Sequence, residues 1–287
     1  MPCTRDRFEL RLGDSGYPAQ LDHTPDPPKR LYGFGDPALL APGLAVIGSR
    51  KATPYGRRAA TMFAGWAAAS GIVVISGAAI GCDQAAHRAA LDVGGPTVAV
   101  LGCGADVDYP SGGAALLDRI RRQGCVISEQ PWGTPPLRWA FARRNRIIAG
   151  LAHAVLVVEA SIPSGTFSTA DAAADAGRDV LAVPGSIFAP ECRGPNRLIR
   201  QGATPVTEID DLVRALDMSD VIVSTPAAVG DTEPVEPLLV ALRANPMRPD
   251  DIAREFGWSI TETARRLSSL EADRVVGRYP DGRYGAY

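Results

Sequence analysis

The residues best suited to chemistry lie between positions 143 and 166, where basic side chains precede an apolar run and a turn of small residues. In order, this stretch contains Arg143, Arg144 and Arg146, the apolar run Ala154–Ala160, and the turn Ser164–Gly165–Thr166. A turn of small residues at the start of a helix can present bare backbone N–H groups to a phosphate. Arginine guanidinium groups can add bidentate contacts to the same oxygens. The stretch therefore indicates the binding of a nucleotide or a nucleic acid.

Two earlier turns close apolar runs in the same way. Gly48–Ser49–Arg50 closes the run 44–49, and Ser76–Gly81 closes the run 72–77. Gly77 has no side chain that would keep a ligand away from the backbone. Open α/β sheets bind ligands at the carboxyl ends of their strands, so Arg50 lies where a phosphate would bind. Taken by itself, Arg50 could equally well be an ordinary surface arginine after a tight turn. The convergence of several such turns on one edge favours a binding site.

The arginine cluster has polar and aromatic neighbours. Asn145 lies within it, and Phe141, just before it, offers a ring on which a base could stack. Trp132 and Trp139 offer further rings, and at least one of these three aromatic residues is expected in the core. Three charged arginines would be costly in a protein interior, so we expect each of them to reach solvent, an acid or a ligand.

Three titratable residues near these turns have simpler structural explanations. Asp83 suits the first turn of a helix, His87 suits a structural hydrogen bond rather than acid–base chemistry, and Glu159 suits an ion pair with an arginine. We therefore assign no catalytic residue. The five cysteines include no CxxC pair, so neither a disulfide framework nor a metal site is expected, and no cofactor is implied.

Apolar runs alternate with amphipathic stretches over residues 44–216, which predicts strands and helices in alternation. The expected strands are 44–49, 72–77, 97–102, 125–129, 154–160 and 179–185, and the expected helices are 55–70, 83–93, 113–123, 139–151 and 168–176. The apolar residues of the strands are continuous, which is typical of strands covered on both faces. This pattern predicts an α/β fold: a Rossmann-like, doubly wound parallel sheet.

The rest of the chain predicts flanking segments and a second domain. Residues 1–43 are expected to form an extension packed on the core, without a long regular element in its Pro- and Gly-containing part, 17–36. Residues 217–236 are acidic and contain prolines, which is typical of a linker. Residues 237–287 predict three helices, with Ser259 and Glu262 as a capping box, and a hairpin around Asp281–Gly282. This arrangement describes a small C-terminal winged helix.

Composition limits the choice of partners and of compartment. The chain has 287 residues, of which 46% are hydrophobic and 22% are charged, and its net charge is −2. A mildly acidic protein can bind phosphates only through a local group of basic residues. Its non-specific affinity for DNA should therefore be weaker than that of a histone-like protein. No apolar run reaches the roughly 18 residues of a membrane span, and the first residues lack the apolar core of a signal peptide. We therefore expect a cytoplasmic protein without a membrane partner.

Taken together, the motifs resemble those of the DNA-processing protein A family, also called DprA or Smf. The matching segments are YPxxL at 17–21, AVIGSRxATPYG at 45–56, SGxAxGxDxxAH at 76–87, YP at 109–110, ISE at 127–129, RNRIIAGL at 144–151, VVEAxxxSGTxxTAxxA at 157–173, and then VPGS and NRLIRxGA. The C-terminal module is similar to the winged helix of the same family. The resemblance spans nearly the whole chain.

The resemblance implies an extended Rossmann domain that binds single-stranded DNA as a homodimer. It also implies that the protein protects incoming DNA during natural transformation and loads the RecA recombinase onto it. Motif by motif, Arg50 and the cluster Arg143–Arg146 would hold the DNA backbone. The dimer would form at the end of the Rossmann domain, where apolar residues recur within 196–216: Leu198, Ile199, Leu212, Val213 and Leu216.

The chain departs from the family pattern at three positions. Ile80 replaces an arginine, Cys82 replaces an isoleucine, and Ala142 replaces a proline. The loss of a positive charge at position 80 would weaken the attraction of that edge for DNA.

Two other functions remain open at this stage. The first is a nucleotide phosphoribohydrolase-like enzyme on the same fold, for which Gly165–Thr166 fits the glycine-rich turn but Thr169 stands where that family has a glutamate. The second is a transcription regulator whose core senses a nucleotide and whose winged helix binds duplex DNA.

Overall fold

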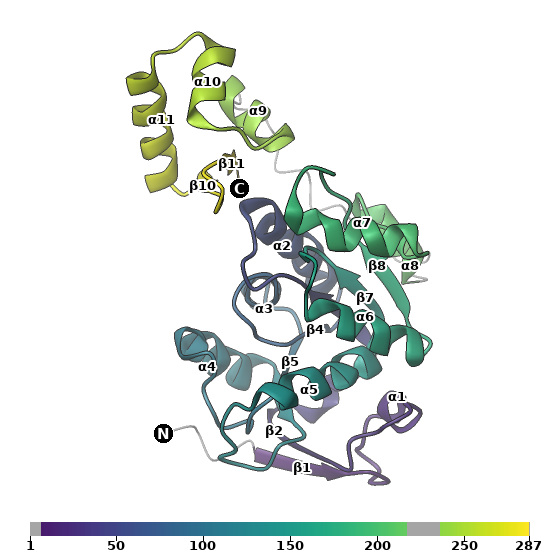
Figure 1. Ribbon diagram of the computed structural model, residues 1–287. Coiled ribbons are helices and arrows are strands. Elements are labelled where there is room, and N and C mark those ends of the chain that lie inside the picture. Colours follow the sequence, from purple (N-terminus) through teal and green to yellow (C-terminus); the bar gives the residue numbers. More distant parts are fainter. Residues whose placement is uncertain (1–6, 217–235, 287) are drawn as a thin grey trace. The chain divides into compact units, whose positions relative to one another are not determined.

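The computed structural model of the protein describes residues 7–216 and 236–286. The chain divides into two compact units (Figure 1). The larger unit contains a nine-stranded sheet, and the smaller unit contains three helices and a two-stranded sheet. The expected linker 217–236 lies outside the described residues except for Glu236, so it stays a prediction. Within the described residues, no helix is long and apolar enough to cross a membrane.

The six expected strands form the parallel part of the large sheet. They are β3 (Gly43–Ile47), β4 (Val74–Ser76), β5 (Thr97–Leu101), β6 (Cys125–Ser128), β7 (Ala152–Val157) and β8 (Asp179–Ala182). A two-residue strand, β9 (Thr204–Pro205), extends the sheet beside β8. The order of the strands is β1-β2-β6-β5-β4-β3-β7-β8-β9. The prediction of a doubly wound parallel sheet is thereby confirmed.

The N-terminal segment contributes two strands that sequence patterns did not indicate. Strand β1 (Arg7–Arg11) pairs with β2 (Arg30–Gly35), and β2 pairs antiparallel with β6. The short helix α1 (Ala19–Asp22) lies between them in the chain. Two glycines interrupt the apolar pattern of β2, which is why its sequence resembles a loop. Gly35 is required there because it has a φ of +91° and a Cβ would lie 2.1 Å from the carbonyl oxygen of Gly124.

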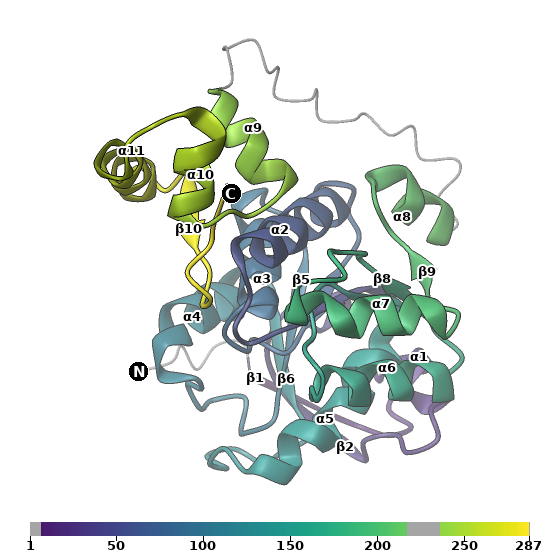
Figure 2. The same cartoon turned by 45° about the horizontal axis from the view of Figure 1, so that its top comes forward.

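Helices cover both faces of the sheet (Figures 1 and 2). One face carries α2 (Pro54–Ala69), α3 (Cys82–Asp92) and α4 (Ala114–Gln123), and the other carries α5 (Arg138–Leu151), α6 (Thr166–Asp175) and α7 (Arg193–Arg200). The right-handedness of strand–helix–strand crossovers requires this division, because the chain moves in one direction from β3 to β6 and in the other from β7 to β9. Helix α8 (Ile209–Ala215) follows β9.

The inner strands of the sheet supply side chains to two cores. On β5, Val98 and Val100 pack toward the helices α5–α7, whereas Ala99 and Leu101 pack toward α3 and α4. All four are 3% exposed or less. Successive side chains of a strand point to opposite faces, so a strand that is buried on both faces must be apolar throughout. The continuous apolar runs in the sequence follow from this geometry.

The direction of winding reverses between β3 and β7, which are neighbours in the sheet. The carboxyl ends of parallel strands lie on one edge, and the loops that leave them diverge at such a reversal. The turns after β3, β4, β7 and β8 therefore meet along a single edge, which we call the carboxyl edge.

The small unit has the predicted winged-helix order. It consists of α9 (Pro237–Ala244), α10 (Pro249–Phe256), α11 (Ile260–Ala272) and the hairpin β10 (Val276–Arg278) with β11 (Tyr284–Ala286). The Ser259 hydroxyl accepts a hydrogen bond from the Glu262 N–H over 3.2 Å, as the capping pattern indicated. Gly282 has a φ of +87° in the turn of the hairpin. Its core consists of apolar residues from all of these elements: Leu238, Leu242, Ile252, Leu267, Val276 and Ala286.

Candidate nucleic-acid interface

A cavity of about 130 Å³ opens on the carboxyl edge beyond β4 and β5. It brings together four residues that the sequence singled out as binding residues: Arg50, Gly77, Phe141 and Arg144. Seven other residues complete its lining: Ala79, Ile80, Leu101, Gly102, Cys103, Tyr109 and Pro110. The sequence patterns did not assign a role to Tyr109, because a tyrosine in a loop carries no signal of its position.

Arg50 and Phe141 form the mouth of this cavity. The guanidinium carbon of Arg50 lies 5.8 Å from the centre of the Phe141 ring, within the range of a cation–π contact. The ring of Phe141 lies 5.1 Å from that of Tyr109, centre to centre. Arg50 is exposed and forms no ion pair with any described acidic residue. A cation beside an aromatic ring suits a phosphate followed by a base.

Arg144 lies beneath the cavity, with 6% of its surface exposed. Its Nη1 donates to the carbonyl oxygen of Gly77 over 2.9 Å and also to that of Val100, so it joins the carboxyl ends of β4 and β5. The sequence pattern predicts that each arginine reaches solvent, an acid or a ligand. Arg144 does not reach solvent, because it is buried and donates to backbone carbonyl groups. Its burial is compensated by backbone carbonyls, which no sequence pattern shows. Burial lowers the pKa of Arg144 to about 10, although Asp83 opposes the shift.

Asp83 occupies the backbone donors of the turn after β4. Its Oδ2 accepts hydrogen bonds from the N–H groups of Gly77, over 3.2 Å, and Ala79, over 3.3 Å. Burial raises the pKa of the Asp83 carboxyl group, while Arg144 and the backbone donors act in the opposite direction. These two N–H groups are thus already satisfied by a carboxylate. The turn after β4 consequently helps to form the wall of the cavity, but its N–H groups at Gly77 and Ala79 are not free to bind a phosphate.

His87 has the structural role that the sequence favoured. Its Nδ1 lies 2.8 Å from the hydroxyl of Thr97, deep below the cavity, and its side chain is fully buried. Burial lowers the pKa of His87 to about 3, and the positive charge of Arg144 adds to the shift. His87 is therefore neutral at physiological pH and does not line the cavity.

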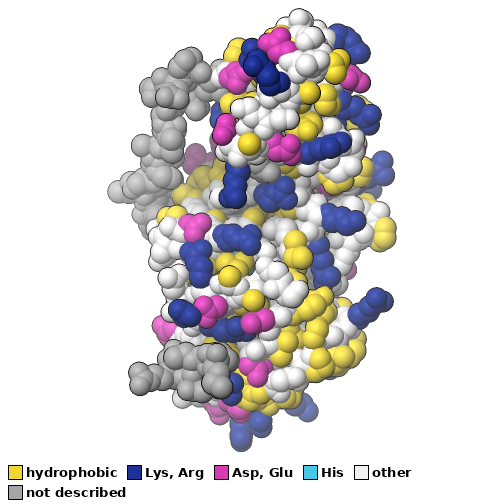
Figure 3. All heavy atoms as spheres, turned by 90° about the vertical axis from the view of Figure 1, so that its left-hand side faces the viewer, with side chains coloured by type: hydrophobic (Ala, Val, Ile, Leu, Met, Phe, Trp, Pro, Cys, Tyr) yellow, Lys and Arg dark blue, Asp and Glu magenta, His cyan; other side chains and the backbone are white. Residues whose placement is uncertain are grey.

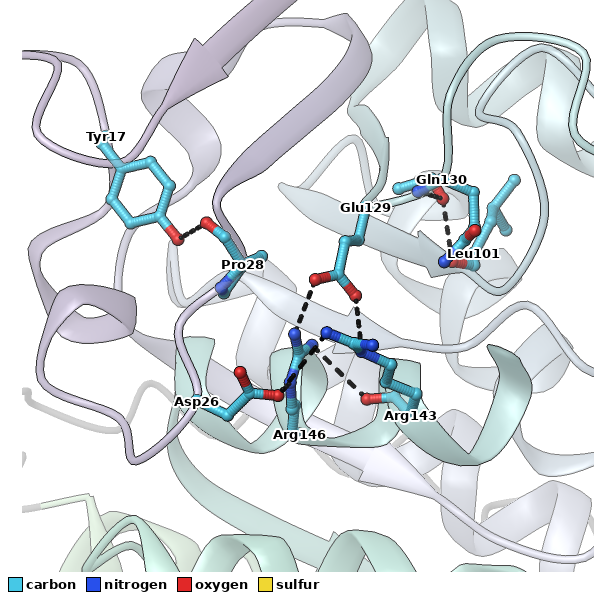
Figure 4. A network of polar contacts seen from close by, with 9 residues as sticks. Tyr17, Asp26, Pro28, Leu101, Glu129, Gln130, Arg143 and Arg146 are labelled. Atoms are coloured by element: carbon cyan, nitrogen blue, oxygen red, sulfur yellow. Dashed lines mark hydrogen bonds and ion pairs between the residues drawn. The ribbon is translucent and has the colours of Figure 1, made fainter. Parts of the chain in front are cut away.

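Arg143 and Arg146 lie beside the cavity in a network with two acids. Arg146 contacts Glu129 at 2.7 Å and Asp26 at 2.8 Å, and Arg143 contacts Glu129 at 3.3 Å and Asp26 at 3.8 Å. Figure 4 shows both guanidinium groups directed toward Glu129, with Asp26 beside Arg146. The hydrogen bond from Arg146 lowers the pKa of Asp26, so this acid is ionised at neutral pH. Two positive charges are thus balanced by two negative ones within the protein.

The turn Ser164–Thr166 lies at the start of α6, next to α5. Asn145 on α5 donates to the Ser168 hydroxyl on α6 over 2.7 Å and so links the arginine cluster to this helix. The Ser164 hydroxyl accepts from the N–H of Thr166 over 3.2 Å. A Cβ at Gly165 would meet no atom within 4 Å, so the turn faces open space.

The turn after β3 is built for close packing. A Cβ at Gly48 would lie 2.7 Å from the Cys82 sulfur, and the carbonyl of Ser49 accepts from the N–H of Cys82 over 3.2 Å. These contacts dock the turn against α3 and hold Arg50 at the mouth of the cavity. Cys82, one of the departures from the family pattern, is fully buried in this contact. Ile80, a second departure, lies in the turn after β4, lines the cavity and is 55% exposed.

The charges on the face drawn in Figure 3 are of both signs. Basic side chains are scattered over this face, acidic side chains lie among them, and hydrophobic side chains gather in the lower right part. Attraction of a polyanion to this face would depend on local groups of basic residues.

The close contact between Gly77 and Arg144 generates a prediction about stability. A Cβ at position 77 would lie 2.4 Å from Nη1 of Arg144, so Gly77→Ala must displace a buried, hydrogen-bonded guanidinium group. We expect the free energy of unfolding in urea to fall by about 1–3 kcal/mol. Gly165→Ala is the matched control and should change it by less than about 0.5 kcal/mol, because its Cβ meets nothing. Equal effects of the two changes would contradict the packing described here.

Comparisons with known proteins identify the family of this chain. The family model for DNA recombination-mediator protein A matches residues 9–217, and that for the DprA winged helix domain matches residues 223–282. The chain is 38% identical to Protein Smf of Escherichia coli over 93% of its own length and 74% of that protein's length.

Two solved structures are similar to this chain in fold and in sequence. The crystal structure of DNA processing protein A from Streptococcus pneumoniae has a TM-score of 0.69 and 39% identity, over 74% of this chain and 75% of that one. The structure of the Helicobacter pylori protein, described in connection with its single-stranded DNA binding mode, has a TM-score of 0.67 and 29% identity, over 74% of this chain and 96% of that one. The chain belongs to the DNA recombination-mediator protein A family, known as DprA or Smf.

Proposed function

We propose that this protein binds single-stranded DNA along the carboxyl edge of its sheet. The observation that carries the proposal is the pairing of Arg50 with Phe141 over the cavity, at 5.8 Å. An extended strand presents a phosphate and a base at each nucleotide, and this pair offers a cation for one and a ring for the other. Both contacts ignore the identity of the base, so little sequence preference is expected.

The roles of the other candidate residues follow from where they lie. Ser164, Gly165 and Thr166 offer a further place for a phosphate at the start of α6, where the surface is open. Arg143 is half exposed and could exchange its contacts with Glu129 and Asp26 for contacts with the strand. Gly48, Ser49, Gly77, Arg144 and Asn145 shape this edge, and Arg146 is held by two acids.

The family supports this function. The related Helicobacter pylori protein is described by its single-stranded DNA binding mode. We extend that activity to this chain, and with it the role of protecting incoming DNA and loading the RecA recombinase during natural transformation and recombination.

The cavity argues for binding rather than for hydrolysis of a nucleotide. None of its lining residues is an aspartate or a glutamate. A nucleotide-hydrolysing enzyme needs a carboxylate or an equivalent base within reach of the bond that it cleaves. Release of a nucleobase from nucleoside monophosphates would favour the enzyme over the binding protein. Stronger binding to duplex than to single-stranded DNA would favour the transcription regulator.

Arg50→Ala tests the contact at the centre of this proposal. Arg50 is exposed, so its loss should leave thermal stability unchanged but weaken the binding of oligothymidylate. The loss of one phosphate contact should reduce the slope of log affinity against log salt by about 0.7. Arg119→Ala is the control, because Arg119 lies on α4 in an ion pair with Asp92 at 2.9 Å. A salt slope equal to that of the unaltered protein would remove Arg50 from the interface, and unfolding would make it a structural residue.

We further propose that the protein is a homodimer through the end of the large unit. The apolar residues of 196–216 are partly used within the chain, since Leu198, Leu212 and Leu216 are at most 9% exposed. Ile199 and Val213 remain half-buried; Ile199 also packs against the core, and the exposed parts of both side chains are available for contact with a second copy.

An isologous dimer would place two DNA-binding edges in one particle, and avidity would then raise the affinity for long strands. Light scattering at tens of micromolar should give twice the chain mass of 30.2 kDa. A monomer mass together with tight binding of DNA would overturn the dimer.

A further inference from the structure

Helix α7 carries a row of arginines to which no role has been assigned above, although two of them, Arg197 and Arg200, lie in the matching segment NRLIRxGA. Arg193, Arg197 and Arg200 are all exposed, and their spacing of four and three residues places them on one face of the helix. None of them forms an ion pair with a described acidic residue. Between residues 183 and 207 the only acid is Glu191, so this stretch is locally basic in a chain whose net charge is −2.

The loop before α7 exposes two large hydrophobic side chains. Ile187 is 75% exposed and Phe188 is 84% exposed, more than any other large hydrophobic side chain among the described residues. Hydrogen bonds hold this loop in place: Phe188 N–H donates to the Ser186 hydroxyl over 3.3 Å, and the Asn196 side chain donates to the carbonyl of Gly185 over 2.9 Å. An anchored loop thus presents an aromatic ring to solvent.

Both features adjoin the proposed DNA-binding edge. The N–H of Gly194 donates to the carbonyl of Ala160 over 2.8 Å, which docks the start of α7 on the segment that follows β7. The guanidinium carbon of Arg197 lies 5.4 Å from the centre of the Phe167 ring, directly after the turn Ser164–Thr166. Figure 2 shows α7 beside α6 on the same face of the sheet.

We propose that Arg193, Arg197 and Arg200, together with Phe188 and Ile187, form a second contact surface for single-stranded nucleic acid. The inference rests on the function proposed above and extends the binding surface from the cavity, past β7, onto α7. The surface combines positive charges on α7 with two exposed apolar side chains in the loop before it, and a strand offers a phosphate and a base at each nucleotide. Because no described acid competes for the arginines, they are more available to phosphates than Arg143 and Arg146, which Glu129 and Asp26 hold.

The geometry also predicts which strands reach this surface. The cavity lies beyond β4 and β5, and three to four strand spacings of about 4.8 Å separate it from β8, or roughly 17 Å. A strand of a few nucleotides can fill the cavity without touching α7. A longer strand can contact both surfaces, so the contribution of α7 should appear only with increasing length.

The test compares two double variants that change the net charge equally. Arg193→Ala with Arg200→Ala removes two arginines of α7, whereas Arg119→Ala with Arg122→Ala removes two exposed arginines of α4, on the opposite face of the sheet. Binding is measured by fluorescence anisotropy with oligothymidylates of about 4 and about 20 nucleotides, which bracket the site sizes of known single-strand-binding folds. Both assays are repeated at several salt concentrations.

For the long strand, the α7 variant should lose affinity, and its salt slope should fall by about 1.4 because two phosphate contacts are missing. For the short strand it should bind like the unaltered protein, as should the α4 variant at both lengths. Phe188→Ala should lower the affinity for the long strand by about 5- to 100-fold through lost stacking. Its thermal stability should be unchanged, because the side chain is exposed.

Two outcomes would overturn the inference, and a third concerns the underlying function. If the α7 variant keeps the affinity and slope of the unaltered protein with the long strand, while Arg50→Ala loses both, DNA binds at the cavity but not on α7. If light scattering shows that the α7 variant or Phe188→Ala changes the mass of the particle, the surface belongs to a contact between copies of the chain. If the unaltered protein binds neither strand, the proposed function itself fails.

Discussion

The carboxyl edge of the sheet depends on one buried charge. Arg144 reaches from α5 to the carbonyl oxygens at the ends of β4 and β5, and Asp83 supports the same turn from the opposite side. A buried guanidinium group that loses its partners typically costs about 3–5 kcal/mol, so these elements are held in one arrangement. Gly77 must lack a side chain because the guanidinium group occupies that space. The cavity above, with Arg50 and Phe141 at its mouth, takes its shape from this constraint.

The arginines of this protein differ in how available they are to an anion. Arg144 is buried and donates to backbone carbonyl groups, and Arg146 forms ion pairs with Glu129 and Asp26. Exposed ion pairs are worth little, so Arg143, which is half exposed, can change partners at small cost. Arg50 and the arginines of α7 have no described acid to displace. A protein with a slightly negative net charge can bind a polyanion in this way, because a few cations without a described acidic partner lie next to partly exposed rings.

Much of the fold could be predicted from sequence, because burial on both faces requires continuous apolar runs such as those of β3 and β7. Strand β2 could not, since its glycines reflect close packing that only the folded chain reveals: Gly33 lies against the ring of Phe8 in β1, and Gly35 lies against Gly124, just before β6. The same limit applies to the site. The turns at Arg50 and Gly77 carry local signals of their position, whereas the burial of Arg144 depends on carbonyl groups from distant strands. Likewise, the ion pair of Asp26 with Arg146 joins residues that lie 120 positions apart, and no pattern near either residue indicates it.

The central claim is that a single strand lies on the carboxyl edge with a base against Phe141. Photocrosslinking tests it most directly: oligothymidylate in which bromodeoxyuridine replaces thymidine is irradiated with the protein, and the adducts are located by mass spectrometry. We expect adducts at Phe141 and at Tyr109, whose rings lie together in the cavity, and their loss when unmodified oligothymidylate competes. Adducts confined to the winged helix, or to the face that carries α2, α3 and α4, would contradict the account.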